Sequence, residues 1–157
     1  QELIVSARAQ LGDEKLQAGE REEGLEFFKL AVKEAPKPMS EKLFADVILQ
    51  FPTNLFFRGE RAAAFDVADM IEEKAEGNAK QMLGLATFYL AIESASAARR
   101  LAVKAIEIET ASETEKSNLP VAYQTLGLAN RLGFQLEESA AAYSKALELD
   151  PESSVSK

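Results

Sequence analysis

The sequence of 157 residues contains no cysteine and no histidine. Without cysteine it has no disulfide, no thiolate nucleophile and no sulfur ligand for zinc or an iron–sulfur cluster. Without histidine it lacks the serine–histidine–aspartate triad, the cysteine–histidine dyad and imidazole metal sites. We therefore predict no enzyme, and assign no catalytic residues, no metal site and no cofactor.

Glycine and proline are also scarce, with 8 and 5 residues. Few turn-forming residues favour long helices. No run of about 18 apolar residues is long enough for a membrane-spanning helix. The net charge of −8 opposes binding to nucleic acid or to an anionic membrane surface, because both are negatively charged. We expect a helical protein that neither inserts into a membrane nor binds nucleic acid. A chain without cysteine is compatible with both reducing and oxidising compartments, so the sequence favours neither.

Both ends of the sequence indicate that more chain exists. The first residue is glutamine rather than methionine, and the last residues are small and polar. We expect the chain to be a fragment of a longer protein.

An internal repeat gives the main signal. Residues 28–36 (FKLAVKEAP) and 143–151 (YSKALELDP) share an aromatic residue, an alanine and a proline at positions i, i+3 and i+8. Residues 102–109 (AVKAIEIE) are similar but lack the proline. The fullest pattern lies in residues 120–153, with Tyr123, Leu126, Gly127, Ser139, Tyr143, Ala146 and Pro151.

This spacing resembles the tetratricopeptide repeat, a 34-residue unit of two helices. Residues 5–38 fit with Leu11, Gly12, Gly24, Phe28, Ala31 and Pro36, and residues 79–112 with Met82, Leu85, Ala86, Tyr89, Ala98, Ala102 and Ala105. Residues 39–78 fit irregularly, if Gly59 marks the turn between two helices. The anchor positions Ala31, Ile71, Ala105 and Ala146 are then 40, 34 and 41 residues apart.

The resemblance implies an all-α fold, an α-solenoid of about four antiparallel helix pairs coiled into a right-handed superhelix. We expect one repeat domain over residues 1–157. The expected helices are 2–17, 21–34, 40–51, 59–76, 79–93, 95–109, 119–132 and 136–149. The third of these helices ends at residue 51, directly before Pro52, which stands within an otherwise helical pattern. Asn118 or Ser117 is expected to cap the seventh.

A tetratricopeptide-like domain is expected to hold a peptide or protein partner in a concave groove lined by the first helix of each pair. The corresponding positions are Asp13, Leu16, Gln17, Lys80, Leu83, Thr87, Leu90, Gln124, Leu128, Arg131 and Leu132. The basic clamp by which some members hold a chaperone's terminal carboxylate is absent. Ala9 and Asp13 replace its lysine and asparagine, and Gly84 stands where the arginine would follow Lys80.

Two alternatives remain open. The chain could be a docking or spacer region of a larger enzyme, or of a secretion or assembly protein. It could also self-associate through its last helix pair, because only six residues follow Pro151 and a repeat array needs a capping helix.

The remaining clusters have simpler interpretations. The adjacent carboxylates Glu22–Glu23, Glu72–Glu73 and Glu137–Glu138 are interpreted as solvated charges, two of these pairs at helix N-termini. Arg99, Arg100 and Lys104 form a basic cluster on a second helix, among acidic residues. The aromatic residues Phe27, Phe28, Phe56, Phe57 and Tyr89 are expected in the core.

Overall fold

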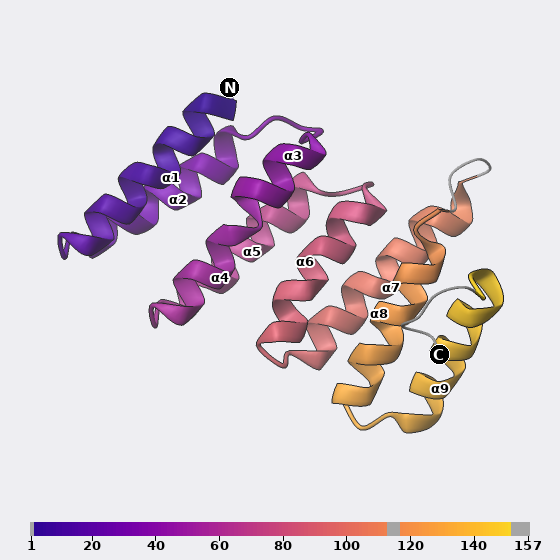
Figure 1. The fold of residues 1–157 in the computed structure, drawn as a ribbon. Coiled ribbons are helices and arrows are strands. Elements are labelled where there is room, and N and C mark those ends of the chain that lie inside the picture. The colour runs from indigo at the N-terminus through magenta and orange to yellow at the C-terminus, as the bar shows by residue number, and fades with distance from the viewer. Residues whose placement is uncertain (1, 113–116, 152–157) are drawn as a thin grey trace. The chain divides into compact units, whose positions relative to one another are not determined.

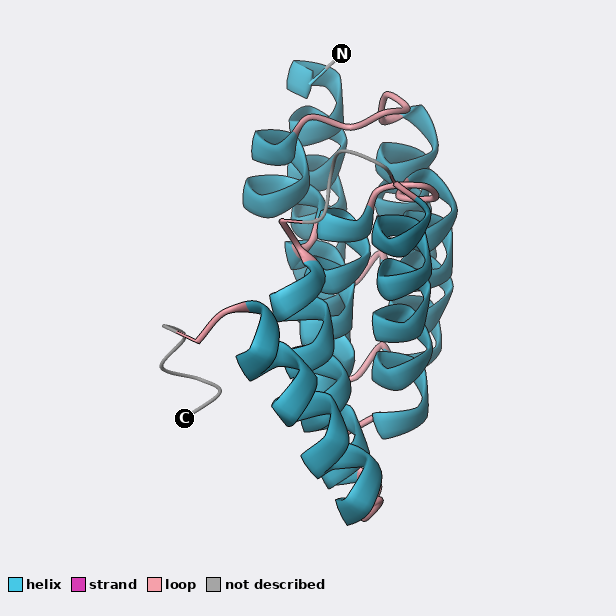
Figure 2. Cartoon of the chain, turned by 90° about the vertical axis from the view of Figure 1, so that its right-hand side faces the viewer, coloured by secondary structure: helices cyan, strands magenta, loops and turns pink. Residues whose placement is uncertain are grey.

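The computed structural model describes residues 2–112 and 117–151, which form helices and short connections without any strand (Figures 1 and 2). The all-α prediction is confirmed. The helices are α1 (Glu2–Gln17), α2 (Arg21–Glu34), α3 (Glu41–Leu43), the π-helical η1 (Phe44–Ile48), α4 (Gln50–Phe57), α5 (Arg61–Lys74), α6 (Ala79–Ala91), α7 (Ala95–Ala111), α8 (Leu119–Leu132) and α9 (Leu136–Leu149). Since only Leu49 separates η1 from α4, the segments α3, η1 and α4 form one interrupted helix.

The helices pack as four consecutive pairs, as the repeat predicts. They are α1 with α2, the interrupted helix with α5, α6 with α7, and α8 with α9. The chain divides into two compact units, residues 1–75 and 76–157, with two pairs each. Within the first unit α2 also contacts α5, and within the second α7 packs on α8. The right-handed superhelix and the single domain stay predictions.

Four helices match their expected bounds residue for residue: 2–17, 21–34, 119–132 and 136–149. The second pair was predicted least well. Its first helix does not end at residue 51 but continues to Phe57, and α5 begins at Arg61 instead of residue 59. The start is as expected, because the Ser40 hydroxyl accepts a hydrogen bond from the Leu43 backbone N–H at 3.1 Å.

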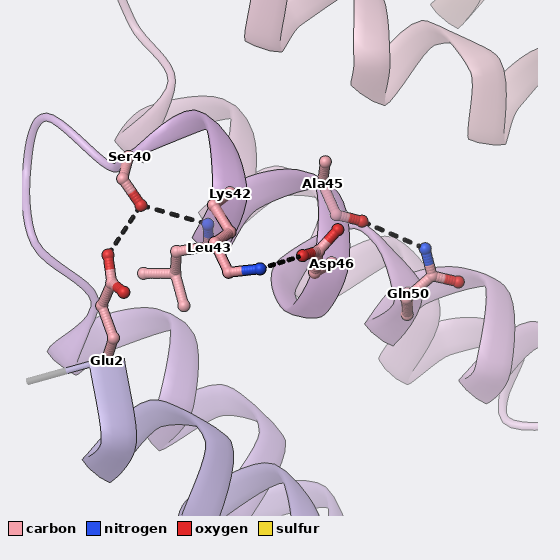
Figure 3. Close-up of polar contacts among 7 residues, drawn as sticks. All are labelled: Glu2, Ser40, Lys42, Leu43, Ala45, Asp46 and Gln50. Atoms are coloured by element: carbon pink, nitrogen blue, oxygen red, sulfur yellow. Dashed lines mark hydrogen bonds and ion pairs between the residues drawn. The ribbon is translucent and has the colours of Figure 1, made fainter.

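The π-helical turn explains why Pro52 does not end this helix. A proline inside a helix clashes with the carbonyl four residues earlier, which here is Ile48, the last residue of η1. In the wider turn the Leu49 N–H donates to Phe44 O, five residues back. The Gln50 side chain donates to Ala45 O at 3.3 Å (Figure 3). We attribute the continuation through Pro52, which is itself buried, to this altered backbone path.

One turn geometry joins the helices of all four pairs. A left-handed residue follows the first helix: Gly19, Gly59, Glu93 or Phe134, with φ of 84°, 88°, 60° and 61°. In each turn the residue after the left-handed one donates its backbone N–H to the carbonyl five positions earlier. Glu20 donates to Lys15 O, for example, and Gln135 donates to Asn130 O. These are the hydrogen bonds of a Schellman motif. The four left-handed residues are 40, 34 and 41 positions apart, the same spacings as the sequence anchors. The irregular second pair is therefore a repeat of the same kind.

In the first unit, glycine allows α1 and α2 to pack closely. A Cβ on Gly12 would lie 2.9 Å from the Phe28 ring, and one on Gly24 would lie 2.8 Å from Leu16 Cγ. The Phe28 ring meets Phe51 of α4 edge-on, with centroids 5.2 Å apart. Phe28 thus lies in the core, as expected, and packs between neighbouring helix pairs.

The second unit uses the same packing with different residues. A Cβ on Gly127 would lie 3.0 Å from the Tyr143 ring, and the Ser139 hydroxyl donates to Gly127 O at 2.8 Å. Buried Ala79, Leu83, Ala105 and Ala122 form a core cluster between α6, α7 and α8. This core positions the exposed sides of α6 and α8.

Candidate protein-interaction surface

In the first unit, Asp13 lies in a polar network between the first helices of two pairs. Its Oδ1 accepts from Arg58 Nη2 at 2.9 Å and from Asn54 Nδ2 at 3.2 Å. Arg58 Nε in turn donates to Asn54 Oδ1 at 2.7 Å. About a third of the Asp13 and Arg58 side chains remains exposed. The partly exposed part of this network is therefore an ion pair of zero net charge beside the Asn54 side-chain amide.

The other two predicted residues of this unit have different environments. Gln17 is exposed near the end of α1, whereas Leu16 is half-buried and packs against Gly24 of α2. Asn54 and Arg58 were not predicted, although their spacing of four residues places them on one helix face. The expected end of the helix at residue 51 concealed this signal.

In the second unit, α6 and α8 lie in contact and contribute eight predicted residues. Lys80, Thr87 and Arg131 are exposed, and the Thr87 hydroxyl donates to the Gly84 carbonyl of its own helix. Half-buried side chains are Leu90, Gln124, Leu128 and Leu132. These seven residues keep apolar and polar surface accessible.

Leu83 differs from the others because only 6% of its surface is exposed. It packs with Ala105 and Ala122 in the core of this unit. A leucine is equally suited to a groove and to a core, so the sequence could not show which of the two Leu83 occupies. Leu83 therefore belongs to the core of the second unit and not to its accessible surface.

Two buried polar residues of the second unit are structural. Glu109 is 3% exposed, and its Oε1 accepts a hydrogen bond from the Asn118 N–H at 3.0 Å, just before α8. The expected side-chain cap of α8 by Asn118 is wrong, since its side chain makes no capping bond, and Ser117 makes no described capping bond either.

The second buried polar residue is Asn130, which links α8 to α7. Arg99 of the basic cluster donates to Asn130 Oδ1 at 3.2 Å.

Aromatic residues near the α4–α5 turn depart from the expected core. Phe28 and Tyr89 are buried, but Phe57 is 71% exposed. The Phe56 ring meets Phe57 edge-on, with centroids 5.7 Å apart. The Arg61 guanidinium lies over the Phe56 ring, with its Cζ 4.8 Å from the ring centroid. Since Phe56 and Phe57 are adjacent, a helix cannot turn both rings toward one core.

Ion pairs near the intra-pair turns carry the clearest electrostatic effects. Lys15 Nζ lies 2.7 Å from Glu20 and 3.0 Å from Glu23. The hydrogen bond from Lys15, followed by Coulombic attraction, lowers the pKa of Glu20, and the same contacts raise the pKa of Lys15. Arg21 pairs with both carboxylate oxygens of Glu60, and that hydrogen bonding raises the Arg21 pKa. Glu20 and Arg21 are exposed, whereas Lys15 and Glu60 are half-buried, and the pairs link neighbouring helices.

Among residues 2–112 and 117–151, no cluster of three or more acidic, histidine or cysteine side chains could hold a metal ion. Within the same ranges no helix has the length and apolar character needed to cross a membrane.

The four helix pairs and their common turn define a helical-repeat protein of the solenoid class. The family model of the tetratricopeptide repeat matches residues 120–153, a range that contains all of α9 and all of α8 except Leu119. This match confirms the resemblance where the motif is fullest. The tetratricopeptide repeat is in general a non-catalytic scaffold for protein–protein interaction. No curated protein matches the chain.

Proposed function

We propose that the chain binds a peptide segment of another protein on the exposed sides of its first helices. The observation that carries the proposal is the tetratricopeptide match to the α8–α9 pair, combined with the accessible leucines of α8. Leu128 and Leu132 are four residues apart and lie on one helix face, with Gln124 one turn before Leu128. On α6, Leu90 and the exposed Lys80 extend this set.

Such a surface suits a peptide with apolar anchors and a few polar groups. A partner that removes the remaining surface of the half-buried leucines from water stabilises the complex by about 25 cal/mol per Å² of apolar surface buried. Arg131 and Gln124 offer hydrogen-bond donors for peptide carbonyl or carboxylate oxygens. In the first unit, the Asp13–Arg58 pair leaves no uncompensated positive charge. A terminal carboxylate is therefore not the expected ligand there.

The test is a substitution on α8 with a matched control on the second helix of the same pair. The binding of selected peptides to the 157-residue chain, to its Leu128→Glu variant and to its Leu136→Glu variant is measured by fluorescence anisotropy. Leu136 is also a leucine and is 65% exposed, but it lies on α9, outside the predicted set. We expect Leu128→Glu to weaken binding at least tenfold and Leu136→Glu to leave it unchanged, with both variants retaining wild-type helicity by circular dichroism.

The opposite pattern would refute the assignment. If Leu128→Glu binds like the wild type, or if Leu136→Glu is the damaging change, the first-helix surface of the second unit is not the binding site. Selection that yields no peptide for the folded chain would count against peptide binding and favour the docking or spacer role.

A further inference from the structure

A second surface of different character lies on the second helices of the first unit. Here α2 and α5 are in contact (Figure 1), and a groove of about 530 Å³ runs beside them. The apolar side chains Phe27, Leu30 and Met70 line it, and all three are half-buried. None of them belongs to the first-helix surface.

The groove has charge of opposite sign at its two ends. Glu22, Glu23 and Glu26 line it near the start of α2, and Lys29 and Lys33 line it toward the end of that helix. A neighbouring pocket of about 220 Å³ shares Lys33 and Met70 and adds Lys37, Lys74 and Glu73, so lysines outnumber the one carboxylate there. The groove is therefore apolar in the middle, acidic at one end and basic at the other.

The internal ion pairs leave much of this charge available to a ligand. Glu23 shares Lys15 with Glu20 and keeps 64% of its side chain exposed. Lys29 Nζ lies 3.9 Å from both Glu26 and Asp66, a distance at the limit of an ion pair. Exposed pairs of this kind contribute little free energy, so exchanging them for a partner's charges costs little.

The backbone chemistry of the groove favours a helical occupant over an extended one. Two helices form its walls, and their backbone groups are already hydrogen-bonded within each helix. An extended peptide would lose hydrogen bonds to water without finding an edge to pair with. An amphipathic helix satisfies its own backbone. The distance from Glu22 to Lys33 along α2, eleven residue steps, corresponds to about 16 Å or three helical turns.

We propose that this groove binds an amphipathic helix of a partner protein, lying antiparallel to α2. Its apolar side chains at i, i+3, i+4 and i+7 would pack on Phe27, Leu30 and Met70. Helices generally carry acidic residues near the N-terminus and basic residues near the C-terminus, because these complement the helix dipole. The antiparallel orientation brings the partner's basic end to Glu22 and Glu23, and its acidic end to Lys33. The site is separate from the proposed first-helix surface.

The test uses a defined probe, a fluorescent 13-residue helical peptide with leucines at i, i+3, i+4 and i+7. It carries two glutamates at its N-terminus and two lysines at its C-terminus. A second peptide has glutamine in place of both lysines. Anisotropy titrations with the 157-residue chain should give tighter binding of the lysine peptide.

Charge recognition is tested by Glu22→Lys with Glu23→Lys. Losing two exposed charge pairs of about 0.5 kcal/mol each weakens the affinity for the lysine peptide about fivefold, and the lysine–lysine repulsion that replaces them weakens it further. The glutamine peptide should respond much less. The control is Glu137→Lys with Glu138→Lys, because these glutamates occupy the same first-turn positions on α9. That variant should bind both peptides like the wild type.

The apolar contact is tested by Leu30→Gln with Met70→Gln, which should weaken binding of both peptides at least tenfold. Leu3→Gln, at an apolar residue that is 86% exposed on α1, is the control and should change nothing.

Binding that survives the paired groove substitution, or that fails for the wild-type chain, overturns the proposal. Loss of binding in Leu128→Glu would also overturn it, by assigning the probe to the first-helix surface. Sedimentation should show a monomer. A dimer that Met70→Gln dissociates would assign the groove to a second copy and refute a partner helix.

Discussion

Phe134 occupies the left-handed position of the last intra-pair turn, where a side chain is under backbone strain. Its φ is 61°, and 88% of its surface is exposed. Glycine takes this position in the first two turns, at Gly19 and Gly59. Replacing Phe134 with glycine should therefore stabilise the second unit.

The magnitude follows from three contributions. The left-handed conformation costs a non-glycine residue about 1–2 kcal/mol, and the substitution removes this cost. Little buried surface is lost because the ring is 88% exposed. Glycine gains about 0.5–1 kcal/mol of conformational freedom in the unfolded chain, which opposes the benefit. The net stabilisation for Phe134→Gly is then about 0.5–1 kcal/mol, or about 2 °C in melting temperature.

The assay is thermal and urea unfolding followed by circular dichroism, with Gly59→Ala as the control in the opposite direction. Gly59 has a φ of 88°, and a Cβ there would meet no atom within 4 Å. The control therefore adds backbone strain without a steric clash. Less the conformational freedom that alanine removes from the unfolded chain, it should lower stability by about 0.5–1 kcal/mol. If Phe134→Gly destabilises the chain while Gly59→Ala behaves as expected, the ring makes a contribution that its exposure does not reveal, and the reasoning is wrong.

Two further predictions concern carboxylates. Glu109→Ala removes the acceptor of the Asn118 N–H and leaves a partly buried donor unpaired, so it should destabilise the second unit by about 1 kcal/mol in urea unfolding. Glu107→Ala, at an exposed position on the same helix, should have little effect, and equal losses would contradict the capping role. For Glu20, NMR titration should give a pKa below the ordinary 4.5, because Lys15 stabilises the charged form. The ion pair's contribution is present at neutral pH and is lost as the pH falls through the lowered pKa, and Lys15→Met should return the pKa toward 4.5.

The sequence predicted best what depends on short-range spacing. Gly12, Gly24 and Gly127 stood at repeat positions where two helices approach, and each lies where a Cβ would press on a neighbouring side chain or backbone. The position of Gly59 predicted the turn of the irregular pair, because left-handed backbone favours glycine. These features depend on residues a few positions apart.

The sequence failed where the outcome depends on distant partners. The rule that proline ends a helix is local, and it did not anticipate a π-helical turn that accommodates Pro52. Leu83 and Leu128 look alike in sequence, but α7 and α8 cover the first and leave the second accessible. The Asp13–Arg58 contact joins residues 45 positions apart, and no local pattern indicates it.

The pairing of helices that follow one another along the chain also bears on how the protein folds. In the first unit α1 packs on α2 and α4 on α5, and in the second α6, α7, α8 and α9 pack in sequence. Such contacts close short loops, so the entropy lost before the first favourable contact forms is small. Each unit can begin folding at any pair and extend to the next pair. We therefore expect refolding within milliseconds, and hydrogen exchange that reports opening of single helix pairs before the whole chain unfolds.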